Sequence, residues 1–273
     1  MTSHHHLGMH TVFLARENIA HIKEWIVYHA LLGIQHFYLY DNTGSIGRDG
    51  SNSTTNKYGI NFFERTKALT DADVADQLDR IIADVSVDVT LIKWQPRDGQ
   101  GRIHYGYNES VYHCIRTYGR QTEWMAFIDV DEFLFSPSGI DMREELSELR
   151  RAGCNRLIIL QKKFLDRFLS SSQYVTDIYD CIEGIDTSAW APKNIVHVDD
   201  LMLESLGSMH VMPVRGKTVA ADTNAIRFNH YNVNPAQLQW MKRFYRTTAE
   251  FKINACDDGM KRYQQRLHDD CRL

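Results

Sequence analysis

The chain has 273 residues, of which 43% are hydrophobic and 24% charged, as in a globular protein of one large or two small domains. A formal charge of -4 argues against a nucleic-acid-binding protein. No window holds about 18 consecutive apolar residues, so we expect no membrane span. The start, MTSHHHLGMH, lacks the apolar core of a signal peptide. We assign residues 1–9 to a tail or tag remnant and residues 10–273 to one domain.

Strand and helix patterns alternate in the first half of the chain, which is typical of a parallel α/β unit. A strand over 10–17, a helix over 18–33 and a strand over 34–42 come first. A glycine- and serine-rich loop follows. The later patterns predict a helix over 72–85, a strand over 87–94, a helix over 104–118, an apolar run over 124–135, a helix over 141–153, strands over 156–160, 194–198 and 225–231, and a basic helix over 240–252.

The five cysteines are scattered, odd in number and never spaced as CxxC. This usage argues against a disulfide framework and against a structural zinc site built on cysteines. We therefore expect packing cysteines and a reducing, cytoplasmic location.

The run WMAFIDVDEFLF (Trp124–Phe135) places three acids, Asp129, Asp131 and Glu132, between apolar residues. Ligands of open α/β sheets bind beyond the carboxyl ends of the strands. Strand alternation puts Asp129 and Asp131 on the same side, where two close charges need a cation. Carboxylate oxygens together with phosphates suit Mg²⁺ or Mn²⁺. The run predicts a divalent metal that carries a phosphorylated ligand; a solvated, idle acidic loop is the alternative.

The segments ARENIAHIKEWIVYHALLGIQHFYLYDN and WMAFIDVDEFLF together resemble the family-92 type of glycosyltransferase. The resemblance extends over most of the chain through PKNIVHV, GSMHVMP and RFNHYNV. The small size of the chain resembles that of enzymes from bacteria and large algal viruses, which implies the cytoplasm of a cell or of a virus-infected host cell. The resemblance implies a GT-A-like domain with a mixed, mostly parallel sheet flanked by helices. It also implies an inverting enzyme that moves a galactose- or xylose-class sugar from a UDP-sugar to a hydroxyl of an oligosaccharide or glycoprotein glycan.

The resemblance also implies roles for residues that could bind the metal and the diphosphate. Asp131, with Asp129 directly or through water, would hold Mn²⁺ or Mg²⁺ on the donor. His230 would supply a third ligand, with His210 as the alternative. Lys193 would steady the leaving phosphate.

Around the nucleotide, the resemblance implies that Asp41 reaches the base or the ribose. The first strand–helix turn carries Arg16, Glu17 and Asn18, where many relatives read Lys-Asn-Glu. The altered order leaves open which of the three side chains contacts the donor.

A catalytic base must lie within hydrogen-bond reach of the attacking hydroxyl. Asp166 is the first candidate and Asp200 the alternative.

Two other classes of protein stay open. One is a phosphotransferase of the haloacid-dehalogenase type, in which Asp129 is the nucleophile and the Asp199–Asp200 pair lies downstream. The other is a non-catalytic protein that binds nucleotides or carbohydrates.

Overall fold

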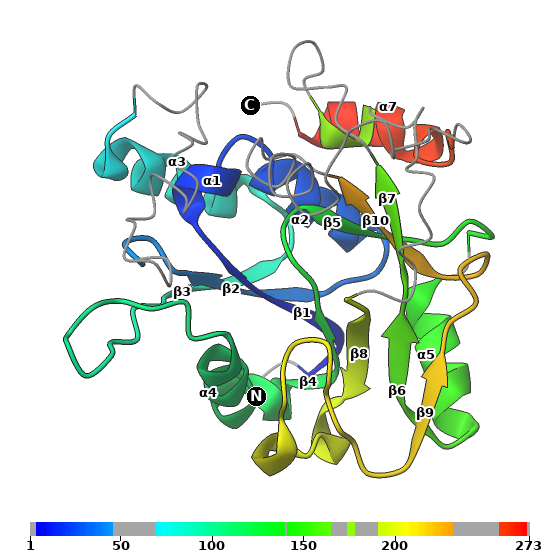
Figure 1. Cartoon of the computed structure of the whole chain (residues 1–273). Helices are drawn as coiled ribbons and strands as arrows, with labels where there is room; N and C mark the ends of the chain where they lie inside the picture. The colour runs from blue at the N-terminus through cyan, green and yellow to red at the C-terminus, as the bar shows by residue number, and fades with distance from the viewer. Residues whose placement is uncertain are drawn as a thin grey trace, which may run out of the picture.

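The structure, a computed structural model, describes residues 4–45, 69–139, 141–164, 174–177, 191–231 and 257–271. Strands in these residues form two sheets (Figure 1). The larger sheet has the order β3-β2-β1-β4-β8-β6-β9, and the smaller has the order β5-β10-β7. The strands are β1 (His5–Phe13), β2 (His36–Asp41), β3 (Asp88–Lys93), β4 (Thr122–Phe127), β5 (Glu132–Phe135), β6 (Cys154–Ile159), β7 (Gln161–Phe164), β8 (Lys193–His197), β9 (Lys217–Ala220) and β10 (Arg227–Tyr231).

Parallel pairing brings several strand ends to one edge of the larger sheet. β1 pairs in parallel with β2 and β4, and β2 pairs in parallel with β3. β8 runs antiparallel to β4 and β6, so its first residue lies at the edge where β4 ends. This mixed, mostly parallel sheet with flanking helices confirms the predicted α/β, GT-A-like fold class.

Helices cover both faces of the larger sheet. In Figure 1, α1, α2 and α3 lie above the sheet and α4 lies below it. The helices are α1 (Ala15–Asn18), α2 (Ile22–Leu31), α3 (Asp71–Asp84), α4 (Tyr107–Tyr118), α5 (Met142–Arg151) and α7 (Lys261–Asp270), with 3-10 turns at Gly119–Gln121, Val175–Asp177, Val198–Asp200 and Leu203–Ser205.

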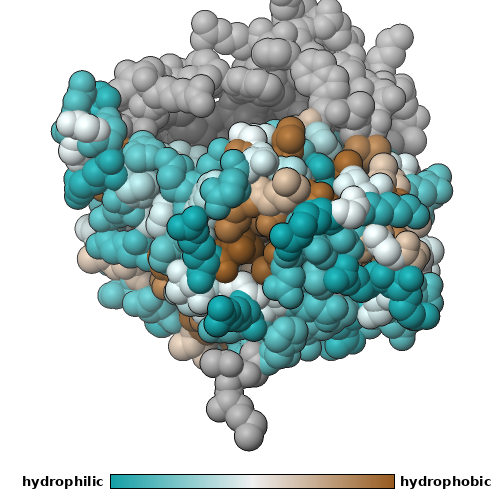
Figure 2. Space-filling model, turned by 90° about the horizontal axis from the view of Figure 1, so that it is seen from below, coloured by the Kyte–Doolittle hydropathy of each residue, from teal (hydrophilic) through white to brown (hydrophobic). Residues whose placement is uncertain are grey.

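Two apolar clusters fill the space between the layers. Phe37 and Leu39 of β2 belong to the cluster under α2 and α3, whereas Tyr38 and Tyr40 belong to the cluster that contains α4. This split follows the two-residue alternation of a strand that is buried on both faces. Figure 2 shows the lower side of the molecule, which is mostly hydrophilic with apolar residues gathered near the middle.

Short polar signals set the starts of two helices. Thr70 and Asp73 form a reciprocal capping box at α3, with the Asp73 amide donating to the Thr70 hydroxyl at 3.1 Å. Asp141 accepts the Arg143 amide at the start of α5. Gly106 precedes α4 with φ +56, and a Cβ there would meet Pro96 at 2.6 Å, so this turn requires glycine.

The structure differs from the sequence prediction at several boundaries. β1 begins at His5, so residues 5–9 are part of the sheet. The predicted helix over 18–33 starts at Ile22, after the separate turn α1. The run 124–135 is not one strand, because β4 and β5 belong to different sheets. The predicted helix over 240–252 lies outside the described residues.

Two further expectations concern cysteines and membranes. Cys114, Cys154 and Cys271, the cysteines within the described ranges, are buried and free, as expected for packing residues. None of the helices that the structure describes is long and apolar enough to cross a membrane.

Candidate active site

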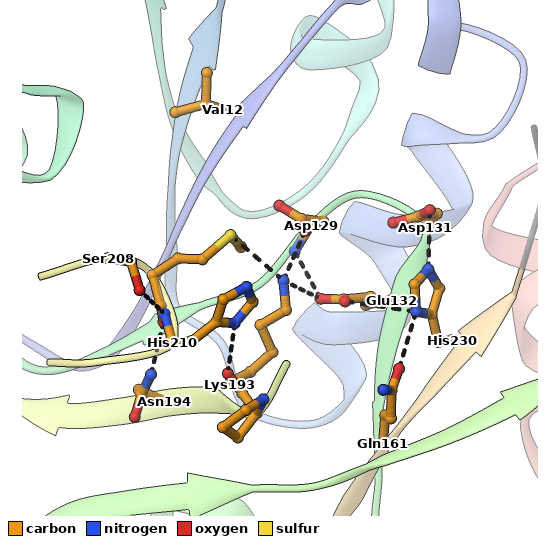
Figure 3. A network of polar contacts seen from close by, with 12 residues as sticks. Val12, Asp129, Asp131, Glu132, Gln161, Lys193, Asn194, Ser208, His210 and His230 are labelled. Carbon is orange, nitrogen blue, oxygen red and sulfur yellow. Dashed lines mark hydrogen bonds and ion pairs between the residues drawn. The ribbon is translucent and has the colours of Figure 1, made fainter. Parts of the chain in front are cut away.

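The three acids of the run 124–135 lie where the chain passes from the larger sheet to the smaller one. We call residues 128–132 the acid loop. The Glu132 amide donates to the Asp129 carbonyl at 3.1 Å, and the Asp129 amide donates to Glu132 Oε2 at 3.0 Å. This turn replaces the expected extended strand. Asp129 and Asp131 therefore face different partners instead of sharing one side, which corrects the alternation argument (Figure 3).

Lys193, the first residue of β8, neutralises one side of the acid loop. Its Nζ lies 2.6 Å from Asp129 Oδ2 and 3.0 Å from Glu132 Oε2 (Figure 3). Only 2% of the Lys193 side chain is exposed, against 32% for Asp129. Burial alone would lower the pKa of Lys193, but the two carboxylates more than reverse this and raise it. Lys193 is therefore a buried counter-ion of the acid loop, and its expected contact with the leaving phosphate stays a prediction.

Asp131 faces the other way, toward His230 of β10. His230 Nε2 lies 3.2 Å from Asp131 Oδ2, and Nδ1 lies 3.2 Å from Gln161 Oε1 (Figure 3). Because an amide oxygen only accepts, Gln161 holds the proton on Nδ1 and turns Nε2 toward Asp131. Glu132 Oε1 lies 3.8 Å from the same ring. One ligand atom each from Asp131, Glu132 and His230 lies within 4.8 Å of the others.

Carboxyl groups crowd this position. Burial raises the pKa of Glu132 to about 7. The positive charge of Lys193 opposes this shift, and the negative charge of Asp129 adds to it. Burial, with the charge of Asp131, raises the pKa of Glu17 in α1 to about 8. Without added positive charge, Glu17 therefore holds a proton at neutral pH beside Asp131. In the first turn, Glu17 lies close enough to Asp131 for the two carboxyl groups to interact.

Tyr105, in the segment before α4, lies near the acids of the site, which the sequence did not reveal. Its hydroxyl donates to the Val12 carbonyl at 3.0 Å, while 44% of the residue is exposed. The enclosure of the hydroxyl, with Asp129 and Glu17 nearby, raises the pKa of Tyr105. An exposed aromatic ring next to the acids can pack against a sugar or a base.

The EWxxYH stretch of α2 anchors the backbone of β5. The Trp25 indole donates to the Glu132 carbonyl at 2.8 Å, and the Tyr28 hydroxyl donates to the Leu134 carbonyl at 2.5 Å. The Leu134 amide donates to His29 Nε2 at 3.0 Å. This bond requires a neutral ring, and burial lowers the pKa of His29 to about 3. The stretch therefore fixes the strand on which Glu132 lies.

Glu24, in the same stretch, anchors a second segment. Its buried carboxylate accepts the amides of Val175 and Thr176, both at 2.7 Å, and the Thr176 hydroxyl at 2.6 Å. Three donors satisfy a carboxylate that would be costly to bury alone.

Two first-turn residues and Asp41 serve the local fold. Arg16 donates to the Leu69 carbonyl and pairs with Asp71 at 2.6 Å, so it faces α3. Asn18 donates to the Leu14 carbonyl at 2.9 Å. Asp41, at the carboxyl end of β2, uses Oδ1 to accept the Ala15 amide and the amide and hydroxyl of Thr43.

The structure does not bring the remaining predicted residues to the metal ligands. His210 Nδ1 bonds to the Pro192 carbonyl at 3.0 Å, and His210 is outside the group formed by Asp131, Glu132 and His230. Asp200 follows the far end of β8, where it pairs with Arg150 and His197, both at 2.9 Å. Because β8 is antiparallel to β4, Asp200 lies at the end of the sheet opposite the acid loop. This position contradicts its predicted role as the alternative base.

Asp166, the first candidate base, lies outside the described residues. The phosphotransferase interpretation gains no support from the fold. Its nucleophile would end the first strand, but the acids follow β4, and the Asp199–Asp200 pair lies at the opposite edge of the sheet.

The sequence of this chain is similar to those of known proteins. A family model described as Glycosyltransferase family 92 matches residues 84–267. A family 92 protein of Ricinus communis is 22% identical over 239 residues, which cover 85% of this chain but 36% of the relative, so the chain spans about a third of that relative's length. A family 92 protein of Oryza sativa subsp. japonica is 23% identical over 133 residues, 49% of this chain and 17% of the relative.

Two solved structures are also similar. A UTP-bound UGPase from Acinetobacter baumannii has a TM-score of 0.34 and 13% identity, covering 97% of this chain and 99% of its own. A UDP-glucose pyrophosphorylase complexed with UDP-glucose has a TM-score of 0.30 and 8% identity, covering 88% of this chain and 80% of its own. A likeness of this degree does not identify a ligand for the present chain.

Proposed function

Starting from the fact that the chain belongs to glycosyltransferase family 92, we propose that it moves a sugar from a UDP-sugar to a glycan hydroxyl with the help of a divalent metal. The donor is of the UDP-galactose or UDP-xylose class, and the acceptor is an oligosaccharide or a glycoprotein glycan. The observation that carries the proposal is the group formed by Asp131, Glu132 and His230 at the carboxyl edge of the sheet.

The residues of this group fit a divalent metal. Two carboxylates and an imidazole are ligands that Mn²⁺ accepts, and Mg²⁺ accepts the carboxylates. The crowding of Glu17, Asp131 and Glu132 points in the same direction, because a cation would relieve it. Gln161 keeps the Nε2 lone pair of His230 directed toward Asp131, as ligation requires.

The metal, when bound, supplies Lewis-acid stabilisation of the diphosphate that leaves the sugar. The protein's own residues hold the site in shape. Lys193 offsets the charges of Asp129 and Glu132, and Trp25 fixes the Glu132 backbone. These contacts restrict the acid loop to one geometry before any donor arrives.

The nucleotide has a candidate place at the end of β2. Asp41 uses one carboxylate oxygen for the turn, and its second oxygen accepts a hydrogen bond from the base or the ribose. The exposed ring of Tyr105 supports binding of the base or the sugar by packing. We further propose inversion at the anomeric carbon, with Asp166 as the base.

Release of UDP from UDP-galactose, UDP-xylose and UDP-glucose tests this proposal. We expect one of the three to turn over with Mn²⁺ and to stop on addition of EDTA. Asp131→Asn and His230→Ala should each lower the rate by about 100-fold or more, since even outer-shell changes around a metal cost about 10–100-fold. His210→Ala is the matched control and should retain the rate. Equal rates in Asp131→Asn and wild type would refute the metal assignment.

A further inference from the structure

A second group of side chains that could hold a metal lies at the amino-terminal ends of β1, β2 and β3, opposite the acid loop. His5 begins β1, His36 begins β2 and Asp88 begins β3. His5 Nε2 lies 3.2 Å from His36 Nδ1 and 3.5 Å from Asp88 Oδ2. One ligand atom from each lies within 4.8 Å of the other two. The three residues come from three adjacent strands, so their backbones are held by the sheet.

These separations match the spacing of ligands around one small cation. In a tetrahedral zinc site with bonds of about 2.0–2.1 Å, neighbouring ligand atoms lie about 3.3 Å apart. Two imidazoles and one carboxylate are a donor set that Zn²⁺ favours, whereas Mg²⁺ prefers oxygen ligands. We propose that His5, His36 and Asp88 bind a Zn²⁺ ion, with water as the fourth ligand.

Thr90 of β3 orients one of the imidazoles. His36 Nε2 lies 2.7 Å from Thr90 Oγ1, so the hydroxyl accepts the Nε2 proton and leaves the Nδ1 lone pair directed at His5. A metal-binding histidine commonly donates its other ring N–H to such an outer partner. The ring also stacks on Tyr38 at a centroid distance of 4.3 Å, which fixes its plane.

Solvent reaches the group from one side. The His5 side chain is 10% exposed and that of Asp88 is 64% exposed. An ion and its water can thus reach the group from the Asp88 side.

This group is separate from the acid loop. His5 pairs with Thr122 at the start of β4, and His10 pairs with Phe127 at its end, just before the acid loop. The two positions are five residue steps apart along the strand, or about 16 Å. The proposed zinc site therefore neither shares ligands with the proposed donor metal nor depends on the proposed transfer reaction.

The position of the group indicates what the ion does. β3 is an edge strand, and most of its residues are only partly buried. A cation bound to His36 of β2 and Asp88 of β3 ties this edge strand to its neighbours at the point where pairing starts.

Direct hydrogen bonds between His5, His36 and Asp88 would fit the same distances, and a zinc titration separates the two cases. The protein, prepared without an affinity tag and stripped with EDTA, carries Asp131→Asn so that the acid loop does not compete. Zn²⁺ is added in competition with a chromogenic chelator. We expect one tight site, a higher Tm with Zn²⁺, and a Co²⁺ derivative with the intense visible bands of tetrahedral coordination.

Variants decide which residues hold the ion. His36→Ala and Asp88→Asn should each weaken Zn²⁺ binding by more than about 100-fold, and Thr90→Val by about 10–100-fold. Asp88 is exposed, so its substitution leaves the fold intact. His6→Ala is the matched control, because His6 adjoins His5 but pairs with Glu123 at 2.7 Å. Absence of a tight site, or binding that persists in His36→Ala and Asp88→Asn, would overturn the proposal, the latter by assigning the zinc to the consecutive histidines 4–6.

Discussion

Replacing Lys193 with methionine tests the counter-ion of the acid loop. The change keeps the length of the side chain but leaves Asp129 and Glu132 without their ammonium partner. Asp129 is about a third exposed, so water can solvate it, whereas Glu132 is 3% exposed. The loss of stability therefore arises mainly from Glu132, despite its longer distance to Lys193. Removing one partner of a buried ion pair lowers the free energy of unfolding by about 3–5 kcal/mol.

The assay is urea and thermal unfolding in EDTA at pH 8. For a chain of this size, a loss of this magnitude corresponds to a fall in Tm of about 6–20 °C. The variant Lys193→Met/Glu132→Gln removes the unpaired buried charge, and we expect a coupling free energy of at least about 2 kcal/mol between the two changes. Lys261→Met is the matched control, because Lys261 forms an exposed pair with Asp258 at 3.3 Å. It should change stability by less than about 0.5 kcal/mol.

A loss below about 1 kcal/mol in Lys193→Met, or no recovery in the double variant, would refute this reasoning. The first result would mean that Glu132 is solvated or shares a proton in the folded protein. The second would mean that Lys193 acts through packing alone, without regard to charge.

Three further predictions concern other contacts. Trp25→Phe removes the indole bond to the Glu132 carbonyl and should cost about 1–3 kcal/mol in urea unfolding, whereas an unchanged midpoint would show that α2 does not anchor β5. Burial lowers the pKa of His10 to about 3, so below pH 6.5 the unfolded chain binds a proton that the native protein does not. Stability should fall between pH 7 and pH 4.5 by about 2–3 kcal/mol more in wild type than in His10→Gln, and equal slopes would contradict the shift. Asp200→Asn should retain UDP release while losing stability, because it breaks the pair with Arg150 at 2.9 Å, and loss of turnover in a folded variant would return Asp200 to the site.

Periodicity predicted most of the strands and helices but not every boundary. β2 was recognisable because its apolar residues end in Asp41 and Asn42, and β8 because NIVHV is rich in the β-branched residues Ile195, Val196 and Val198. The start of β1 was missed, since consecutive histidines resemble a tag although His5 is buried in the sheet. The turn in the acid loop was missed as well. Apolar residues on both sides of Asp129 and Asp131 are consistent with either one strand or two.

The site could be predicted only where residue types carry a spacing signal. The pattern of Asp129 and Asp131 located the acid loop, and the end of a strand drew attention to His230. The burial of Lys193 was not visible in the sequence, because it depends on β8 packing against β4. Gln161 and Tyr105 are single residues without a spacing pattern, and only the meeting of distant segments gives them a role.

Calorimetric titration of UDP and GDP, each with and without Mn²⁺, is the direct test of a metal-dependent nucleotide site at the acid loop. We expect UDP to bind only with Mn²⁺, GDP to bind weakly or not at all, and Asp131→Asn to abolish the metal-dependent binding. UDP binding of the same strength without Mn²⁺, or no binding of either nucleotide, would contradict a metal-dependent nucleotide site at the acid loop.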